Sequence, residues 1–287
     1  MWFRWLMCAL TVASLSAADN EAKLTRLLNN RLKAVTTLRL DRDAYFPGEI
    51  ATLTITVTNP TNEPLEIPAP FEPTSSGIDL MGKDTPQARE LGVEYWYLAP
   101  HRFSDFPTRL DTGSIVLHPA VRLERTVRSD EKHFGYYRWF GHRGAVPATP
   151  GEYRVEFSYD TRVHVDFRVV QPEMTQFVAA PLPALGGTDR EAPRGYMHAF
   201  VLAFGGRYAI CRNVQATALN PELFRGYYGD LAPLERVGEM DEPVTALRVR
   251  LEGEGAVVEW ATARQSMRAE INSATIDRYL PRTEIVR

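Results

Sequence analysis

The feature that most constrains the fold is the stretch of residues 43–71, where a turn, an alternating strand, a second turn and a shorter strand follow one another. One side of the alternating strand carries Leu53, Ile55 and Val57, whereas the other side carries only threonines. A period of two with β-branched residues is typical of a strand that buries one face in an antiparallel sheet. The stretch therefore predicts a β fold.

The first 18 residues have the pattern of a secretory signal peptide. Arg4 precedes an uncharged apolar run, and small residues lead to the expected cleavage after Ala18. The run is shorter than the about 20 residues that a membrane-spanning helix needs. Cys8 does not follow the small residue that a lipoprotein signal requires. We therefore expect export to the periplasm or the extracellular space, with no membrane span in the mature chain.

The composition argues against several classes of partner. The chain has 33 basic and 36 acidic residues and a net charge of −3, which offers no basic surface for nucleic acid. Cys211 is the one cysteine beyond the signal, so no internal disulfide is expected, and its apolar surroundings predict a buried, inert thiol. The six histidines lack the spacing of metal ligands. We expect no cofactor and no metal.

Short strands separated by turns fill the first half of the chain. Leucines spaced by three and four predict a short helical segment over residues 19–34. About eight strands follow, including a second alternating hairpin over residues 153–169. This density of strands predicts an all-β protein whose residues 35–170 form an antiparallel β-sandwich.

Three short motifs resemble a known group of domains. They are Tyr-Phe-Pro-Gly-Glu at residues 45–49, Val-Thr-Asn at residues 57–59, and Pro-Gly-Glu-Tyr-Arg-Val at residues 150–155. These look like the early and late strands of bacterial immunoglobulin-like domains, as in the intracellular proteinase inhibitors of bacilli and macroglobulin-type repeats. The resemblance implies an immunoglobulin-like sandwich over residues 35–170. It does not imply inhibitor activity, because no inhibitory residue matches.

The rest of the chain predicts a second, smaller β domain. Residues 171–194 are rich in proline and glycine and have the composition of a linker. Beyond them, hairpins are expected over residues 197–214 and 244–262, and a final strand over residues 268–276. We recognise no family for residues 195–287.

One short string matches a catalytic motif. Asp111-Thr112-Gly113-Ser114 has the sequence found at the active site of aspartic proteases, which need two carboxylates that share one proton. The chain holds no second copy, so a bilobal protease is excluded and only a dimer could supply the other carboxylate. Because the string precedes a predicted strand and is ordinary turn chemistry, we interpret it as a turn.

The segment of residues 133–143 is the strongest binding candidate. Its possible ligand-binding side chains are Tyr136, Tyr137, Trp139, Phe140 and His142. Aromatic side chains on a loop between strands form stacking platforms for sugars or the centre of a protein interface. The alternative is that these rings fill the core or the junction between the two domains.

The sequence thus predicts an exported, non-catalytic binding or scaffolding protein. Its partner would be a protein or, through the aromatic segment, a polysaccharide. A hydrolase whose motifs are not recognised is the remaining alternative, favoured only if acidic residues of both domains meet in a cleft.

Overall fold

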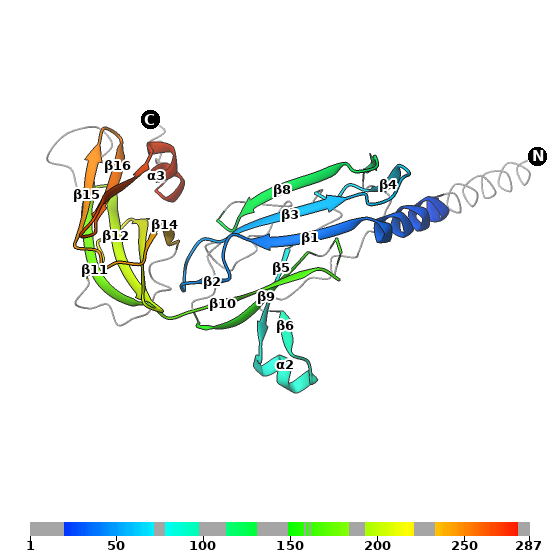
Figure 1. The fold of residues 1–287 in the computed structure, drawn as a ribbon, viewed down its shortest axis with the longest axis horizontal. Coiled ribbons are helices and arrows are strands. Elements are labelled where there is room, and N and C mark those ends of the chain that lie inside the picture. The colour runs from blue at the N-terminus through cyan, green and yellow to red at the C-terminus, as the bar shows by residue number, and fades with distance from the viewer. Residues whose placement is uncertain are drawn as a thin grey trace, which may run out of the picture. The chain divides into compact units, whose positions relative to one another are not determined.

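The computed structural model describes residues 20–71, 78–97, 113–130, 149–157, 159–160, 162–183, 193–220 and 233–280. The chain forms two compact units, each mostly β (Figure 1). The first unit comprises residues 1–43, 52–139 and 152–167, and the second comprises residues 44–51, 140–151 and 168–287. The turn at residues 44–51 therefore belongs to the second unit, although the sequence led us to place it in the first domain.

The first unit contains the predicted alternating strand at the centre of a three-stranded sheet. The sheet is antiparallel throughout, in the order β1 (Val35–Leu40), β3 (Thr52–Thr58) and β8 (Arg122–Arg128). Leu53, Ile55 and Val57 are fully buried. The face with the threonines of β3 is the outer one, because these threonines share cross-strand rows with exposed polar residues of β1 and β8.

A second sheet of the first unit lies in the order β10-β9-β5-β6. Its strands are β5 (Ile78–Lys83), β6 (Tyr95–Tyr97), β9 (Gly151–Phe157) and β10 (His164–Val169), and a separate pair joins β4 (Leu65–Pro68) to β7 (Ser114–Leu117). The hydroxyl of Tyr159 donates to the carbonyl oxygen of Pro68 at 3.0 Å, and so ties the end of β9 to the end of β4. The N-terminal helix, residues 20–33, buries Leu27 in the same unit.

A short helix interrupts the hairpin of β5 and β6. Helix α2 (Pro86–Leu91) lies in the part of the chain for which the sequence predicted only short strands and turns. Its start and stop signals are present in the sequence: Thr85 caps the first turn, Pro86 opens the helix, and Gly92 ends it in the left-handed conformation. The four prolines of residues 68–90 concealed these signals, because one of them opens the helix rather than breaking it.

The second unit packs two antiparallel sheets against each other. The first contains β11 (Glu173–Leu182), β12 (Gly195–Phe204), β13 (Arg207–Gln215) and β14 (Glu235–Met240). The second contains β15 (Ala246–Glu252), β16 (Gly255–Ala261) and β17 (Ser266–Ile271). Both predicted hairpins are confirmed, and Gly205-Gly206 turns between β12 and β13 with φ angles of 52° and 80° that suit glycine.

Two expectations for this region differ from the structure. The segment of residues 171–194, expected as a linker, contains β11, which pairs with β12 along its whole length. Pro181 is accommodated because β11 is an edge strand, where one side needs no amide hydrogen. The expected last strand ends at Ile271, and α3 (Ser273–Tyr279) follows, because the side chain of Asn272 accepts from the amide of Thr275 and caps a helix.

The core between these two sheets forms around Trp260 of β16. It also includes Met197, Val201 and Ile210 from the first sheet and Ile276 from α3. No helix among the described residues is long and apolar enough to cross a lipid bilayer.

A glycine under Trp260 offers a test of this packing. A Cβ atom at Gly238 would lie 2.7 Å from Cζ2 of the Trp260 ring, closer than the atoms can approach. We expect Gly238→Ala to lower the free energy of unfolding by about 1–3 kcal/mol, which chemical denaturation would measure. The matched control is Gly113→Ala, whose new Cβ would meet nothing within 4 Å. Equal stability of Gly238→Ala and wild type would contradict the packing.

Candidate functional site

The aromatic site predicted from the sequence lies outside the described residues. This applies to Tyr136, Tyr137, Trp139, Phe140 and His142, so their role in binding stays a prediction. Asp111 and Thr112 of the protease-like string also lie outside the described residues, and Ser114 begins β7.

Among the described residues, the most deeply buried ion pair begins in the turn of residues 44–51. Strand β2 (Ala44–Tyr45) pairs in parallel with Arg168 and Val169 at the end of β10. Further along the turn, the amide of Ile50 donates to the carbonyl oxygen of Leu234 at 2.8 Å. In return, the amide of Leu234 donates to the carbonyl oxygen of Gly48 at 2.7 Å. Backbone hydrogen bonds therefore hold both sides of the turn within the second unit.

The turn covers one face of the first sheet of this unit. Phe46 is fully buried and packs in a cluster with Phe200 and Leu202 of β12 and with Leu234. The opposite face of β12 carries Met197, Ala199 and Val201, which pack toward the second sheet. Because both faces are covered, β12 is apolar along almost all its length rather than alternating.

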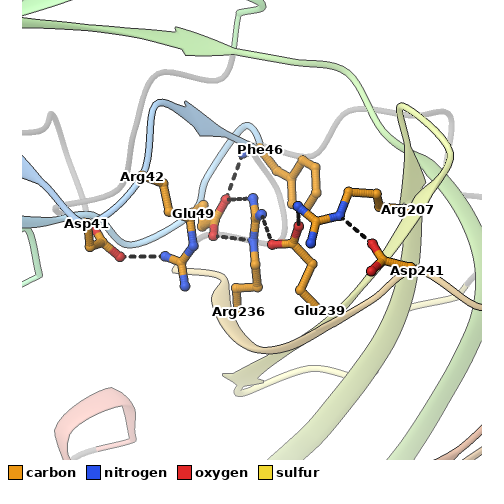
Figure 2. Close-up of polar contacts among 8 residues, drawn as sticks. All are labelled: Asp41, Arg42, Phe46, Glu49, Arg207, Arg236, Glu239 and Asp241. Atoms are coloured by element: carbon orange, nitrogen blue, oxygen red, sulfur yellow. Dashed lines mark hydrogen bonds and ion pairs between the residues drawn. The ribbon is translucent and has the colours of Figure 1, made fainter.

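A charged pair anchors the turn at its tip (Figure 2). Glu49 is fully buried, and Arg236 of β14 donates to both of its carboxylate oxygens, from Nε to Oε1 at 2.8 Å and from Nη2 to Oε2 at 2.7 Å. Oε2 also accepts from the amide of Phe46 at 2.8 Å. A bidentate pair with an added amide hydrogen bond is the geometry that makes a buried carboxylate tolerable.

The pair continues into a chain of alternating charges that Figure 2 shows running from Glu49 to Asp241. Arg236 donates to Glu239 at 3.1 Å, Glu239 pairs with Arg207 at 2.5 Å, and Arg207 donates to Asp241 at 2.9 Å. Burial decreases along this chain, since the side chain of Arg236 is 3% exposed and that of Asp241 is 83% exposed. The chain thus leads from the buried turn to solvent.

Two aromatic rings enclose the Arg236 guanidinium. Its carbon lies 4.2 Å from the centre of the Phe46 ring and 5.3 Å from that of Phe204, and the two rings meet edge to face at 5.0 Å. Desolvation on burial lowers the pKa of Arg236, but the Glu49 carboxylate outweighs it, so that the pKa lies above its usual value. Arg236 is therefore held as a cation. We interpret the cluster as an anchor for the turn, because Arg236 occupies both carboxylate oxygens that a proton-transferring Glu49 would need.

A second polar group is buried on the same face of the sheet. His198 is fully buried between the rings of Phe177 and Tyr196, at centroid distances of 5.7 and 6.2 Å. Its Nε2 accepts from the amide of Leu219 at 3.1 Å, which requires the proton on Nδ1, where Asn213 Oδ1 accepts at 3.0 Å. Burial lowers the pKa of His198, although the hydrogen bond to Asn213 acts in the opposite direction. The lowered pKa favours the neutral form of the ring. Neither His198 nor any other described residue belongs to a group of three or more histidine, cysteine, aspartate or glutamate side chains that could hold a metal ion.

Sequence reasoning missed most of this site. The Cys211 side chain is fully buried, as expected, but its cross-strand neighbour is Arg236, which no local pattern places beside it. Glu49 and Arg236 are 187 residues apart, and their pairing depends on a turn that leaves the first unit. The one available signal was a glutamate flanked by a strongly apolar turn, Tyr45-Phe46 before it and Ile50 after it.

Comparisons with known proteins give no family. No family model matches the chain, and no curated protein matches it. Solved structures with some likeness include a β-glucosidase from Erythrobacter marinus, at 12% identity and a TM-score of 0.26, and the sporulation control protein Spo0M from Bacillus subtilis, at 13% and 0.26. The matches cover 48% of this chain and 15% of the β-glucosidase, and 86% of this chain and 93% of Spo0M. Likeness at this level carries no argument about fold or activity.

The anchor can be tested by removing its charges singly and together. We expect Arg236→Met to lower the free energy of unfolding by about 3–5 kcal/mol, because it leaves the Glu49 carboxylate buried without a partner. The double variant Glu49→Gln with Arg236→Met should recover part of this loss, since no buried charge remains. Urea denaturation would measure all three proteins.

The matched control for the anchor is Arg250→Met, which removes an exposed pair with Glu252 and should cost less than about 1 kcal/mol. If Arg236→Met costs no more than this control, the buried pair does not anchor the turn.

The buried histidine predicts a pH dependence. A histidine whose pKa is lowered in the folded state binds its proton more readily when unfolded, so its contribution to stability is complete above the unfolded pKa of 6.5 and is lost as pH falls below that value. We expect stability measured by urea denaturation to decline from pH 7.5 to pH 5.5 in the wild type, and less steeply in His198→Gln. Parallel profiles for the two proteins would contradict the assignment.

Proposed function

We propose that this chain is an exported protein that binds another protein in the periplasm or outside the cell and carries out no catalysis of its own. The observation that supports it is the location of exposed apolar side chains. Seven large apolar residues are exposed among the described residues, and all but Leu251 belong to the first unit. Those of the first unit are Leu32, Val35, Leu91, Val93, Val116 and Val121.

Three of these side chains lie at one end of the three-stranded sheet. Val35 begins β1 opposite Thr58 of β3, and Thr58 in turn lies opposite Arg122 of β8, directly after Val121. Since neighbouring strands are about 4.8 Å apart, Val35 and Val121 lie on the order of 10 Å from each other. Leu32 lies at the end of the N-terminal helix, three residues before Val35. Gathered exposed apolar residues of this kind are typical of protein interaction sites.

The remaining parts of the proposal have separate support. Export is supported by the signal-like pattern of residues 1–18. An immunoglobulin-like arrangement of the first unit is supported by the antiparallel pairing of β3 with both β1 and β8 and of β5 with β9. A scaffolding role would use the same exposed surface.

A capture experiment with matched variants tests the proposal. The purified chain would be immobilised and exposed to an envelope extract, and we expect one saturable protein partner whose recovery falls at least about ten-fold for Val35→Glu, because a charge at the centre of an apolar contact must be desolvated. The control is Leu251→Glu, which adds the same charge to an exposed leucine of the second unit.

Two outcomes would contradict protein binding through this surface. One is the absence of any saturable partner, and the other is equal loss of recovery in Val35→Glu and Leu251→Glu. Retardation of the chain by a polysaccharide in affinity electrophoresis, abolished by Trp139→Ala, would favour the carbohydrate-binding alternative instead.

A further inference from the structure

Strand β1 forms an edge of the three-stranded sheet, and its backbone has a defined open side. One residue past β1, where the register of the two strands continues, the amide of Asp41 donates to the carbonyl oxygen of Thr52 at 2.9 Å, so the backbone of Asp41 points toward β3. In an antiparallel ladder, hydrogen-bonded pairs alternate with non-bonded ones. The residues Arg39, Thr37 and Val35 therefore bond to β3, whereas the amides and carbonyls of Thr36, Leu38 and Leu40 point away from it.

The open side of β1 has no partner among the described residues. No described strand lies beyond β1 in its sheet. Leu38 sits on the core-facing side of β1, yet it is only half-buried, in contrast to the fully buried Ile55 opposite it. The core-facing side of the sheet is therefore more exposed to solvent at edge strand β1 than at central strand β3.

The other edge of the sheet is protected by charge, and β1 is not. Strand β8 carries four charged residues in seven positions: Arg122, Glu124, Arg125 and Arg128. Arg125 lies opposite Ile55, on the core-facing side, and its guanidinium donates to the carbonyl oxygen of Phe71 at 3.3 Å. Charges along an edge, above all inward-pointing ones, prevent pairing with another strand. Strand β1 carries one charge, Arg39, and neither proline nor glycine.

Arg39 gives the partner a chemical character. It is exposed on the outer face of the sheet opposite Thr54, and no carboxylate among the described residues pairs with it. A strand added to β1 would place one outward side chain next to Arg39, and an acidic side chain there would complete a cross-strand charge pair. The inward positions would be apolar, in line with Leu38 and Leu40.

We propose that β1 is the docking edge for an extended segment of a partner protein, with alternating apolar residues and a carboxylate opposite Arg39. This rests on the proposed function and names the mode of binding: the partner adds a strand to the sheet, with affinity from backbone hydrogen bonds and specificity from the carboxylate.

A synthetic peptide provides the probe. It has the sequence of β3, residues 52–58, with Thr54→Glu, because β3 is the strand that β1 already pairs with on its other side and Thr54 is the residue opposite Arg39. We expect it to slow amide hydrogen exchange at Thr36, Leu38 and Leu40 of the purified chain by about ten-fold, measured by NMR. Exchange at Thr126, on the edge of β8, should not change.

Two proline variants separate the edges. Leu38→Pro removes an amide that points to the open side, without removing a hydrogen bond to β3, and should abolish peptide binding. Thr126→Pro makes the same change at the open side of β8 and should leave binding intact.

A charge exchange tests the same edge without proline. Arg39→Glu should bind the peptide with Thr54→Glu at least about ten-fold more weakly and prefer a peptide with Thr54→Lys.

The outcomes decide between occupants. The proposal is overturned if the peptide does not bind the folded wild type, if Leu38→Pro binds it as well as Thr126→Pro does, or if Arg39→Glu keeps the wild-type preference. Concentration-dependent dimerisation of the wild type that Leu38→Pro abolishes would also overturn it, because a second copy would then occupy the edge. None of these results affects capture of a partner through Val35, so failure at the edge and failure of the proposed function remain distinguishable.

Discussion

The buried pair of Glu49 and Arg236 is the interaction on which the second unit depends. A turn that belongs by sequence to the neighbourhood of β1 and β3 lies instead on the first sheet of that unit, with Phe46 against Phe200. Removing two charges from water is costly, and the cost is offset here by bidentate geometry, an amide hydrogen bond and two aromatic faces around the guanidinium. The arrangement requires all of these contacts together, which fixes the position of the turn.

Coverage by this turn explains why the two units have different strand patterns. Strand β3 alternates between Leu53, Ile55 and Val57 on one side and threonines on the other because only one face of its sheet is buried. Strand β12 has core residues on both sides because the second sheet covers one face and the turn covers the other. The same polypeptide thus shows the two limiting patterns of a β-strand, and the difference follows from what packs on each face.

Local chemistry allowed the hairpins to be predicted, and distance in sequence hid the rest. The Gly205-Gly206 turn and the alternation of β9 are signals carried within a few residues, and the structure confirms both elements. Helices α2 and α3 also have local signals, at Thr85 and Asn272, but nearby prolines concealed the first and the strand that directly precedes α3 concealed the second. The apolar residues around Glu49 are a weak local signal, but nothing local identifies Arg236 as its partner, since only the tertiary fold brings β14 to the turn.

Ion pairs occur in both units, and two groups of charges show how differently such residues are placed. In the second unit the charges of Glu49, Arg236 and Glu239 are engaged with one another, so they stabilise the fold and are not free to recognise a ligand. In the first unit Arg39 lies exposed beside an edge that lacks the charges protecting β8. A charge paired within the chain contributes to the stability of the fold. A charge without such a partner contributes mainly to binding, when another molecule supplies the opposite charge. Arg39 differs in this respect from other charges of the first unit, such as Arg154, which is paired with Asp166, and this difference is what the proposed docking edge relies on.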